Sequence, residues 1–383
     1  MEGALSSAIH LSLLMGPIVA VPVPAFMIDA LEEASVTTTA GQRSGFQLRF
    51  KVSSKSALNT IFLIAAGQNT SIGTPPLRVV LIVTMNGRPE PMFDGVVTNV
   101  QVQAGQTGHG GTITVTGEDL TKVMDLLDFS GTPYPAMPIA ARVALICAKY
   151  AAFGIIPLPI PEFFTDVPIP IERIPAHQGT DLAYIQQLAN EVGHVFYIEP
   201  GPTPFTNIAY FGPEIKVGPP QPALNTDMDA HTNVESLDFT FDPTKGVLPV
   251  VFIQNPQTRV PIPIPIPNLN PLQPPLGLLP TPIANLKLMK DTAKLNPAQA
   301  ISKGLNEAKK SQDSVRASGT LNVLRYGRML KARRLVGVRG AGVAYDGLYY
   351  VESVRSTLKR GEFKQRFELT RNGLISITPV VPV

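Results

Sequence analysis

The chain has 383 residues, which is long enough for two or three domains with their own hydrophobic cores. Charged residues make up only 16% of it, and its 38 prolines are about twice the common frequency. A formal net charge of +3 is too small to indicate nucleic-acid binding, and a single cysteine excludes an internal disulfide framework. Low charge with much proline favours surfaces that partner proteins cover.

Residues 1–24 form an apolar N-terminal segment that several prolines interrupt. The segment is too short to cross a bilayer, and it has no basic residue of the kind that opens a signal peptide. We therefore expect no membrane insertion by this chain, and a soluble protein that is made and assembled in the cytoplasm.

Residues 25–130 predict a first antiparallel β-barrel or sandwich. The stretch GFQLRFKV (45–52) alternates apolar and polar side chains, as a half-buried strand does. A more fully buried strand is expected at 77–85, and strands at 93–102 and 112–117 flank a glycine-rich turn.

Residues 131–232 predict a small α+β domain. One helix follows Pro138, and a second is capped by Thr180 and ends at Gly193. Two short apolar strands, VFYIEP and NIAYFG, come directly after the second helix.

A second β-barrel is predicted from two separate pieces, residues 233–244 and 315–375. The insertion between them, residues 245–314, carries a Pro-rich arm and one helix that begins at Pro297. Residues 376–383 form a C-terminal tail.

The arm, VPIPIPIPNLNPLQPPLGLLPTP (260–282), is apolar but cannot be helical, because proline recurs at every second position at its start. Alternating prolines remove the N–H groups from one edge of an extended chain only. Ile262, Ile264 and Ile266 keep their donors on the other edge. We expect an ordered arm whose isoleucines are buried against a neighbouring subunit or against the second barrel.

A short sequence echo predicts that the two β-barrels are copies of one unit. Phe93-Asp94-Gly95 opens a strand, a glycine turn and an alternating strand, and Tyr345-Asp346-Gly347 opens the same series. The two units should superpose with Asp94 over Asp346.

The C-terminal part of the chain is locally basic. Lys364 and Arg366 occupy outward positions of the alternating strand 363–369. We expect them to face either a channel or a neighbouring ring. The alternative is that these strand faces are simply solvated.

No arrangement of residues in the sequence predicts catalysis, a metal site or a cofactor. Glu191 and His194 have the spacing of a metal pair, but Gly193 breaks the helix between them. Cys147 lies on an apolar helical stripe, where a cysteine is most often a core residue. We expect a protein that is not an enzyme.

Two segments carry a resemblance to a known family. HQGTDLAYIQQLANEVGHVFYIEPG (177–201) resembles the Q-x-x-S/T-D-L-x-x-I/L-x-x-L-A-x-E-x-G-x-x-F-Y segment of phage late control protein D and VgrG-type hubs. DGLYYVESVRSTLKRGEFKQRFELTRNG (346–373) is similar to the closing hairpin of the same proteins. The likeness covers roughly residues 25–245 and 315–373, and the insertion at 245–314 has no counterpart in it.

The resemblance implies a mainly β chain with two tube-like β-barrels, a small α+β domain and the Pro-rich arm as an addition. It implies a structural baseplate hub of a contractile phage tail or injection system, assembled in the bacterial cytoplasm. In such hubs a homotrimer adapts the six-fold tail tube to the three-fold spike.

The same resemblance implies the partners. They are further copies of this chain, the tail tube protein or a tube-initiator ring, the baseplate wedge proteins, and a tape-measure protein or cargo in the lumen. Because the sequence ends at Val383, soon after its last predicted strand, the spike is expected to be a separate protein.

Two questions stay open from the sequence. A soluble all-β binding or adhesion protein is the alternative function, although the chain has no tryptophan to form a carbohydrate-binding platform. The particle could be a DNA-carrying phage or a headless injection device.

Overall fold

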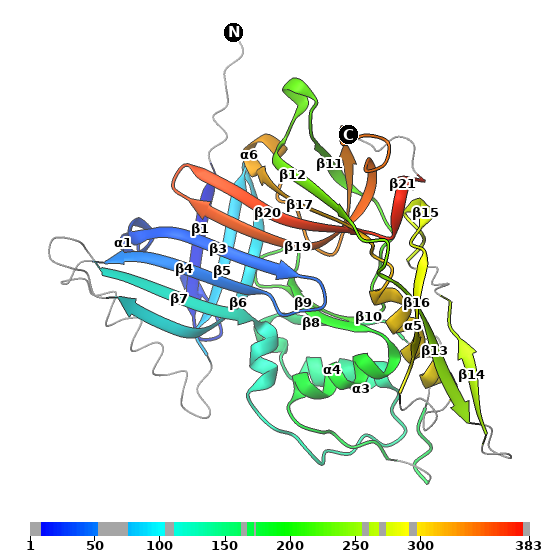
Figure 1. Ribbon diagram of the computed structural model, residues 1–383. Helices are drawn as coiled ribbons and strands as arrows, with labels where there is room; N and C mark the ends of the chain where they lie inside the picture. The colour runs from blue at the N-terminus through cyan, green and yellow to red at the C-terminus, as the bar shows by residue number, and fades with distance from the viewer. Residues whose placement is uncertain are drawn as a thin grey trace.

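The computed structural model describes residues 9–52, 76–103, 111–161, 167–171, 174–254, 260–267, 273–290 and 297–377. One 13-stranded sheet runs through most of the molecule, and smaller layers lie below it in Figure 1. The predicted mainly β class with a smaller α+β part is confirmed.

The first β unit has five antiparallel strands whose order in the sheet is β3-β4-β7-β6-β5. Its core is formed by alternate residues such as Phe46, Leu48 and Phe50, which are buried as the sequence pattern predicts. Its strands are β3 (Leu31–Thr39), β4 (Gly45–Val52), β5 (Arg78–Met85), β6 (Arg88–Gln103) and β7 (Gly111–Asp119). Beyond β5 lie β1 (His10–Gly16) and β2 (Val21–Pro22), and α1 (Ala25–Ala30) precedes β3.

The second β unit has the order β12-β17-β20-β19-β18, and β11 pairs with β18 at its far side. β12 pairs with β17 although residues 245–314 separate the two strands in the chain. The strands are β11 (Gln221–Asn225), β12 (Val234–Phe241), β17 (Val315–Asn322), β18 (Leu335–Arg339), β19 (Gly347–Lys359) and β20 (Glu362–Arg371), and α6 (Val323–Tyr326) follows β17.

The two units are internal repeats of each other. If the strands of each unit are numbered 1 to 5 along the chain, both units have the spatial order 1-2-5-4-3. The registers agree as well. The first strand has a β-bulge in each unit, at Glu32 in β3 and at Glu235 in β12. The fourth strand also has one in each unit, at Thr98 in β6 and at Glu352 in β19.

This register corrects the expected match between the two Asp-Gly pairs. Counting from the bulges at Thr98 and Glu352, Asp94 is equivalent to Leu348, two residues away from Asp346. The Asp-Gly pair also does not begin both strands. β6 starts at Arg88 because a tight turn at Asn86-Gly87, both with positive φ, extends its pairing with β5.

The units are joined edge to edge into one sheet. β3 of the first unit pairs antiparallel with the C-terminal half of β19, from Thr39 opposite Ser353 to Glu33 opposite Lys359. The N-terminal half of β19 pairs on the same side with β18. The sequence did not predict that the two β units share a sheet.

Below the first unit lies an α+β layer, a three-stranded sheet with the order β8-β10-β9 and two helices (Figure 1). Its second helix has the predicted ends, since Thr180 accepts a hydrogen bond from the Ala183 N–H and Gly193 adopts positive φ. The elements are α3 (Ile139–Ala148), α4 (Asp181–Val192), β8 (Ile155–Pro159), β9 (Val195–Pro200) and β10 (Asn207–Gly212), with short 3-10 turns at Leu120–Asp125, Ala151–Phe153 and Asp229–His231.

A buried ion pair attaches this layer to the first β unit. The Arg78 guanidinium donates to both carboxylate oxygens of Asp94 at 2.8 and 2.6 Å, and Asn207 of β10 donates to the same carboxylate at 2.8 Å. Arg78 also donates to the Phe153 carbonyl oxygen at 2.9 Å. Both charged side chains are almost fully buried, so the carboxylate depends on this set of donors.

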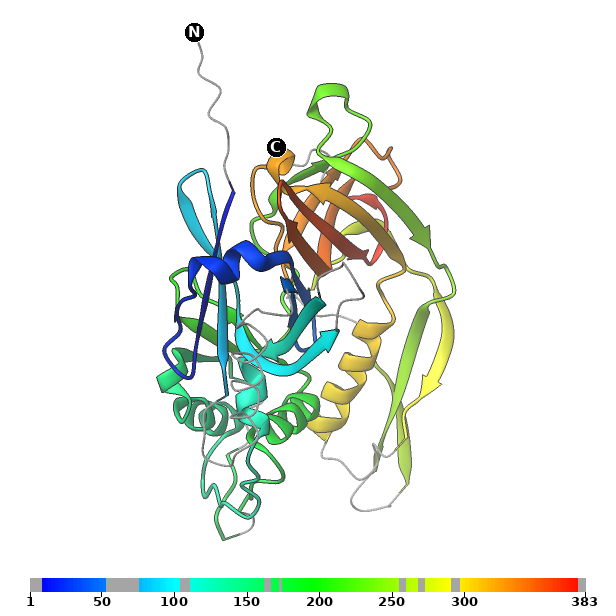
Figure 2. The ribbon, with the colours of Figure 1, turned by 90° about the vertical axis from the view of Figure 1, so that its left-hand side faces the viewer.

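The insertion folds into a layer of its own beside the α+β layer (Figures 1 and 2). We call its three strands, in the order β14-β13-β16, the arm sheet. Helix α5 covers one face of it closely, because a Cβ on Gly304 would lie 2.8 Å from both Ile266 and Val251. The elements are β13 (Gly246–Gln254), β14 (Pro261–Pro265), β16 (Ile283–Leu288) and α5 (Pro297–Lys310), and β15 (Gly277–Pro280) pairs with β21 (Gly373–Ser376).

Among the described helices, none combines the length and the apolar character needed to cross a membrane.

We predict that Asp94→Ala lowers the free energy of unfolding by about 3–5 kcal/mol, because it leaves the Arg78 guanidinium buried without its carboxylate. Urea unfolding followed by circular dichroism measures this. The control is Glu368→Ala, which removes an exposed carboxylate of β20 and should change stability by less than about 0.5 kcal/mol. Equal losses in the two variants would contradict the role given to the ion pair.

Candidate interaction surfaces

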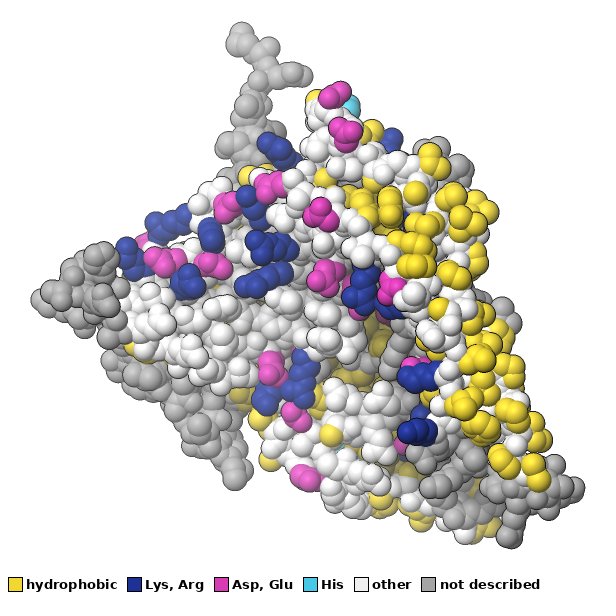
Figure 3. Space-filling model, in the orientation of Figure 1, with side chains coloured by type: hydrophobic (Ala, Val, Ile, Leu, Met, Phe, Trp, Pro, Cys, Tyr) yellow, Lys and Arg dark blue, Asp and Glu magenta, His cyan; other side chains and the backbone are white. Residues whose placement is uncertain are grey.

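The 13-stranded sheet presents a polar face, visible towards the viewer in Figure 3 as a mixture of basic and acidic side chains. Lys364 contacts Glu235 at 3.1 Å and Glu362 at 2.9 Å, and Lys359 contacts Glu33 at 3.6 Å. These pairs link strands of both β units across an open hollow. The lining residues are Glu33, Glu235, Ser236, Thr320, Arg355, Thr357, Lys359, Glu362, Lys364 and Arg366.

Lys364 and Arg366 therefore lie on this polar face, as their outward strand positions predict. The sheet places them among acidic neighbours rather than in a purely basic patch. What this face contacts in an assembly stays a prediction.

In the part of the chain that the structure describes, β12 and part of β6 are among the strand edges that have no paired neighbour. β12 ends the strand order on one side. In β6, residues 99–103 pair with β7 on one side. On the other side, the contacts with the β5 strand end at Val97, whose N–H donates to the Leu77 carbonyl oxygen at 2.9 Å. An open edge of this kind can receive a strand from another chain.

The three arm isoleucines follow one face of β14 but differ in burial. Ile266 is 6% exposed and packs within the insertion itself, near Val251 and Gly304. Ile264 is half-buried and Ile262 is 48% exposed. Their contact with another copy stays a prediction, and the chain itself already covers Ile266.

Alternating prolines occur on two edge strands, not one. In β14 the Ile266 N–H points inward to the Pro249 carbonyl oxygen at 2.9 Å, and in β8 the Ile160 N–H points inward to Phe211 at 2.6 Å. The prolines alternate with these inward donors. Pro261, Pro263 and Pro265 in β14 and Pro157 and Pro159 in β8 therefore offer no N–H group to the outer edge. Neither edge can accept another strand in a regular ladder.

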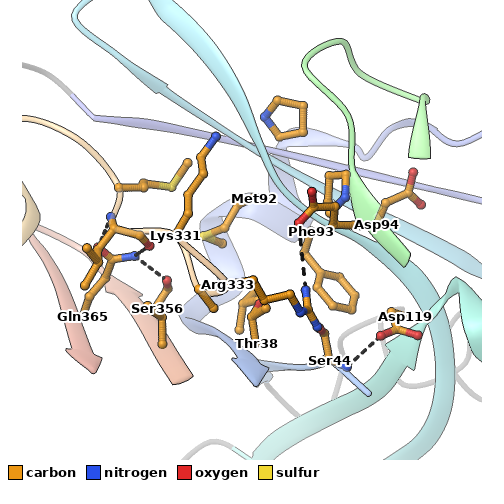
Figure 4. Close-up of a pocket in the computed structure, with 18 of the residues that line it drawn as sticks. Thr38, Ser44, Met92, Phe93, Asp94, Asp119, Lys331, Arg333, Ser356 and Gln365 are labelled. Carbon is orange, nitrogen blue, oxygen red and sulfur yellow. Dashed lines mark hydrogen bonds and ion pairs between the residues drawn. The ribbon is translucent and has the colours of Figure 1, made fainter. Parts of the chain in front are cut away.

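A cavity of about 120 Å³ lies where the two β units and the α+β layer meet (Figure 4). Gln365 and Ser356 line one side, Ser44 and Asp119 the other, and Arg333 lies between them. The cavity has room for a few water molecules only, and its basic and acidic residues are balanced. We interpret it as a polar junction.

Arg333 holds this junction together. Its guanidinium donates to the Thr39 carbonyl oxygen at 3.0 Å and lies over the Tyr197 ring at 4.0 Å. Glu199 lies 4.0 Å from Arg333 and 3.5 Å from Arg334. One side chain of the second β unit thus contacts the end of β3 and strand β9.

One buried cluster has the residue types of a catalytic site. Tyr134 lies 3.0 Å from His177 Nδ1, and His177 Nε2 lies 3.5 Å from Asp181, which also binds Lys149 at 3.0 Å. Burial lowers the pKa of His177. The His177 and Asp181 side chains are fully buried, and their contact joins the start of α4 to the preceding loop. Within the described residues, no group of side chains could hold a metal ion.

A second charge cluster lies at the bulge of β19. Burial raises the pKa of Glu352, and the neighbouring Glu214 carboxylate raises it further. Lys216 lies 2.6 Å from Asp313 in the same cluster, although it is nearly buried.

Comparison with known proteins shows the fold. No family model matches the sequence, and no curated protein matches it. A tail protein from Neisseria meningitidis MC58 superposes with a TM-score of 0.60 at 13% identity, over 96% of this chain and 98% of that one.

Two further structures agree. The 43 kDa tail protein of prophage MuSo2 from Shewanella oneidensis gives a TM-score of 0.56 at 14% identity, over 94% of this chain and 98% of that one. A chain of the Francisella PdpA–VgrG complex gives 0.60 at 9% identity, over 98% of this chain and 60% of that one. The chain has the fold of phage tail and VgrG proteins, and the predicted resemblance is confirmed at that level.

We predict that Glu352→Gln stabilises the protein increasingly as the pH rises above about 4.5. A raised pKa means that the folded state favours the protonated carboxyl. In the wild type, the stability that the protonated Glu352 carboxyl contributes is complete below the pKa of the unfolded chain. It is lost as the pH rises through the pKa of Glu352 in the folded protein. Glutamine cannot ionise, so the variant does not lose this stability. Melting temperatures of both proteins from pH 4 to pH 8 measure the difference. A constant difference across this range would contradict the assignment.

Proposed function

We propose that this chain is the structural baseplate hub of a contractile tail or injection system, and that it acts as a homotrimer. One observation carries the proposal. The chain holds two β units of the same strand order, and in the described residues β12 at one end of the sheet and part of β6 have an edge without a paired strand.

The pairing of β3 with β19 inside the chain predicts how two chains would pair. In the second unit, the free flank of β19 receives β3, the first strand of the first unit. The equivalent flank in the first unit is residues 99–103 of β6, and the equivalent first strand is β12. β12 of one copy would therefore pair with β6 of the next.

The repeat also gives the register of this contact. Arg355 lies opposite Thr37 inside the chain. Gln101 is the equivalent of Arg355, and Thr240 is the equivalent of Thr37, so Gln101 of one copy would lie opposite Thr240 of the next. The same register brings Val102, which is exposed in the single chain, opposite Phe239 of the next copy. Closing the ring would cover both apolar side chains.

A head-to-tail contact of this kind closes into a ring when the rotation between copies permits it. Three copies supply six β units. A trimer with this repeat would match a six-fold tail tube on one side and a three-fold spike on the other. The proposed partners are the tube protein or a tube-initiator ring, a separate spike protein and the baseplate wedge proteins.

The polar sheet face would line the channel of this ring. Its paired charges and many hydroxyl side chains offer no apolar patch to a passing polymer. A tape-measure protein or a cargo is the proposed occupant. Lys364 and Arg366 would then face the lumen.

The proposed role is structural and not enzymatic, in a baseplate that is assembled in the bacterial cytoplasm. The side chains of His177 and Asp181 in the candidate catalytic cluster are fully buried, which closes them to a substrate.

We predict that the double variant Gln101→Cys, Thr240→Cys forms disulfide-linked trimers under mild oxidation. Directly opposed residues of antiparallel strands have Cβ atoms about 5 Å apart, which suits a disulfide. Both positions are exposed, and the native Cys147 is buried. Non-reducing gel electrophoresis and light scattering measure the linked species.

The matched control pairs Gln101→Cys with Ser236→Cys, four residues further along β12. That distance is too long for a disulfide, so the control should stay unlinked. Two outcomes would refute the register. One is disulfide-linked trimers in the control alone. The other is no linked species in either variant although the protein is trimeric in solution.

A further inference from the structure

We propose that the outer face of the arm sheet docks on the α+β layer of the neighbouring copy in the ring. This inference rests on the proposed trimer and adds a second contact, below the paired strands, that the trimer proposal does not require.

The outer face is apolar, and leucines on it are exposed in the part of the chain that the structure describes. β13 and β16 place Leu248 opposite Leu286 and Val250 opposite Leu288 on the side away from α5. The opposite side faces the helix, since Val251 lies near Gly304 and Lys287 contacts Glu307 at 2.5 Å. Leu286 is 69% exposed and Leu288 is 63% exposed.

The apolar surface extends beyond the arm sheet. Figure 3 shows it as a continuous hydrophobic band along the right edge of the molecule. The exposed apolar residues in this region are Val260, Leu278, Leu279, Ile283, Leu286 and Leu288. A band of this size on a soluble protein marks an interaction surface.

The prolines decide how the arm makes contact. The outer edge of β14 has no N–H groups, because Pro261, Pro263 and Pro265 fill its outward positions. A partner therefore cannot extend the arm sheet at this edge. The contact must use side chains of the open face.

The repeat explains why the arm lies where it does. Arg78 and Asp94, which attach the α+β layer to the first unit, are equivalent to Leu335 and Leu348 in the second. These leucines instead form an apolar cluster with Leu276, which belongs to the insertion. The arm thus takes the place under the second unit that the α+β layer takes under the first.

This equivalence identifies the occupant. Around the ring, α+β layers and arms would alternate in a second tier below the β units. The covered side of the arm already meets the α+β layer of its own chain, where α5 contacts α4. Its open side points the other way and would face the α+β layer of the next copy.

The neighbour offers a matching edge. In its three-stranded sheet, β9 lies towards its own second β unit, where Glu199 contacts Arg334. β8 is the opposite edge, and its exposed side chains Ile156 and Leu158 are apolar. Pro157 and Pro159 offer no N–H group at the outer edge of β8, so both partners are suited to packing and not to strand pairing.

The test compares two single variants of the full chain that each add one carboxylate to β16. Leu286→Asp places it on the open face, and Asn285→Asp places it one residue away on the face towards α5. Equilibrium sedimentation measures the concentration at which each trimer dissociates. We expect Leu286→Asp to raise that concentration at least about tenfold, because a carboxylate without a partner would be buried, and Asn285→Asp to leave it unchanged.

A charge reversal across the contact identifies the partner surface. Adding Leu158→Lys to the Leu286→Asp chain should recover most of the lost affinity, since every copy supplies both surfaces. A trimeric wild type in which Leu286→Asp behaves like Asn285→Asp would overturn this inference alone and leave the arm for a different protein. A wild-type chain that stays monomeric would overturn the proposed function itself.

Discussion

The architecture depends on the backbone pairing between β3 and β19. This ladder runs from Thr39 opposite Ser353 to Glu33 opposite Lys359 and converts two β units into one sheet. Arg333 reinforces its end by binding the Thr39 carbonyl oxygen. Because the two units are repeats, a single kind of edge contact can serve within the chain and between chains. In the proposed trimer, β6 and β12, which have unpaired edges among the described residues, would form that same contact.

Equivalent positions of the two repeats have acquired different chemistry. The first unit holds its lower layer with the Arg78–Asp94 ion pair and Asn207, whereas the second uses an apolar cluster around Leu335. A buried ion pair fixes its partners in one geometry but depends on every hydrogen bond being made. Apolar contact is less directional and suits an added segment such as the arm.

Local sequence patterns predicted the individual elements well. Strict alternation identified β4, and the cap at Thr180 with the glycine at 193 identified both ends of α4. The similar sequences around Asp94 and Asp346 predicted the repeat, although the structural register aligns Asp94 with Leu348, two residues from Asp346. Short motifs do not fix register, whereas bulges such as those at Thr98 and Glu352 do, and bulges are visible only in paired strands.

Other features could not be read from the sequence because they depend on contacts between distant segments. The shared sheet joins residues more than 300 positions apart, and nothing near Thr39 points to Ser353. The alternating prolines of β14 predict a one-sided strand edge, whereas the two prolines of β8 are seen to lie on an outer edge only once its pairing with β10 is known. The open apolar face of the arm sheet became evident only when pairing showed that Leu286 and Leu288 point away from α5.

A cryo-electron microscopy map of the purified full-length chain in its assembled form tests the central claim most directly. We expect a closed ring of three copies in which β12 of each copy lies antiparallel on β6 of the next, so that one continuous sheet surrounds a polar channel. A ring with another number of copies, or three copies whose β12 edges remain unpaired, would contradict it.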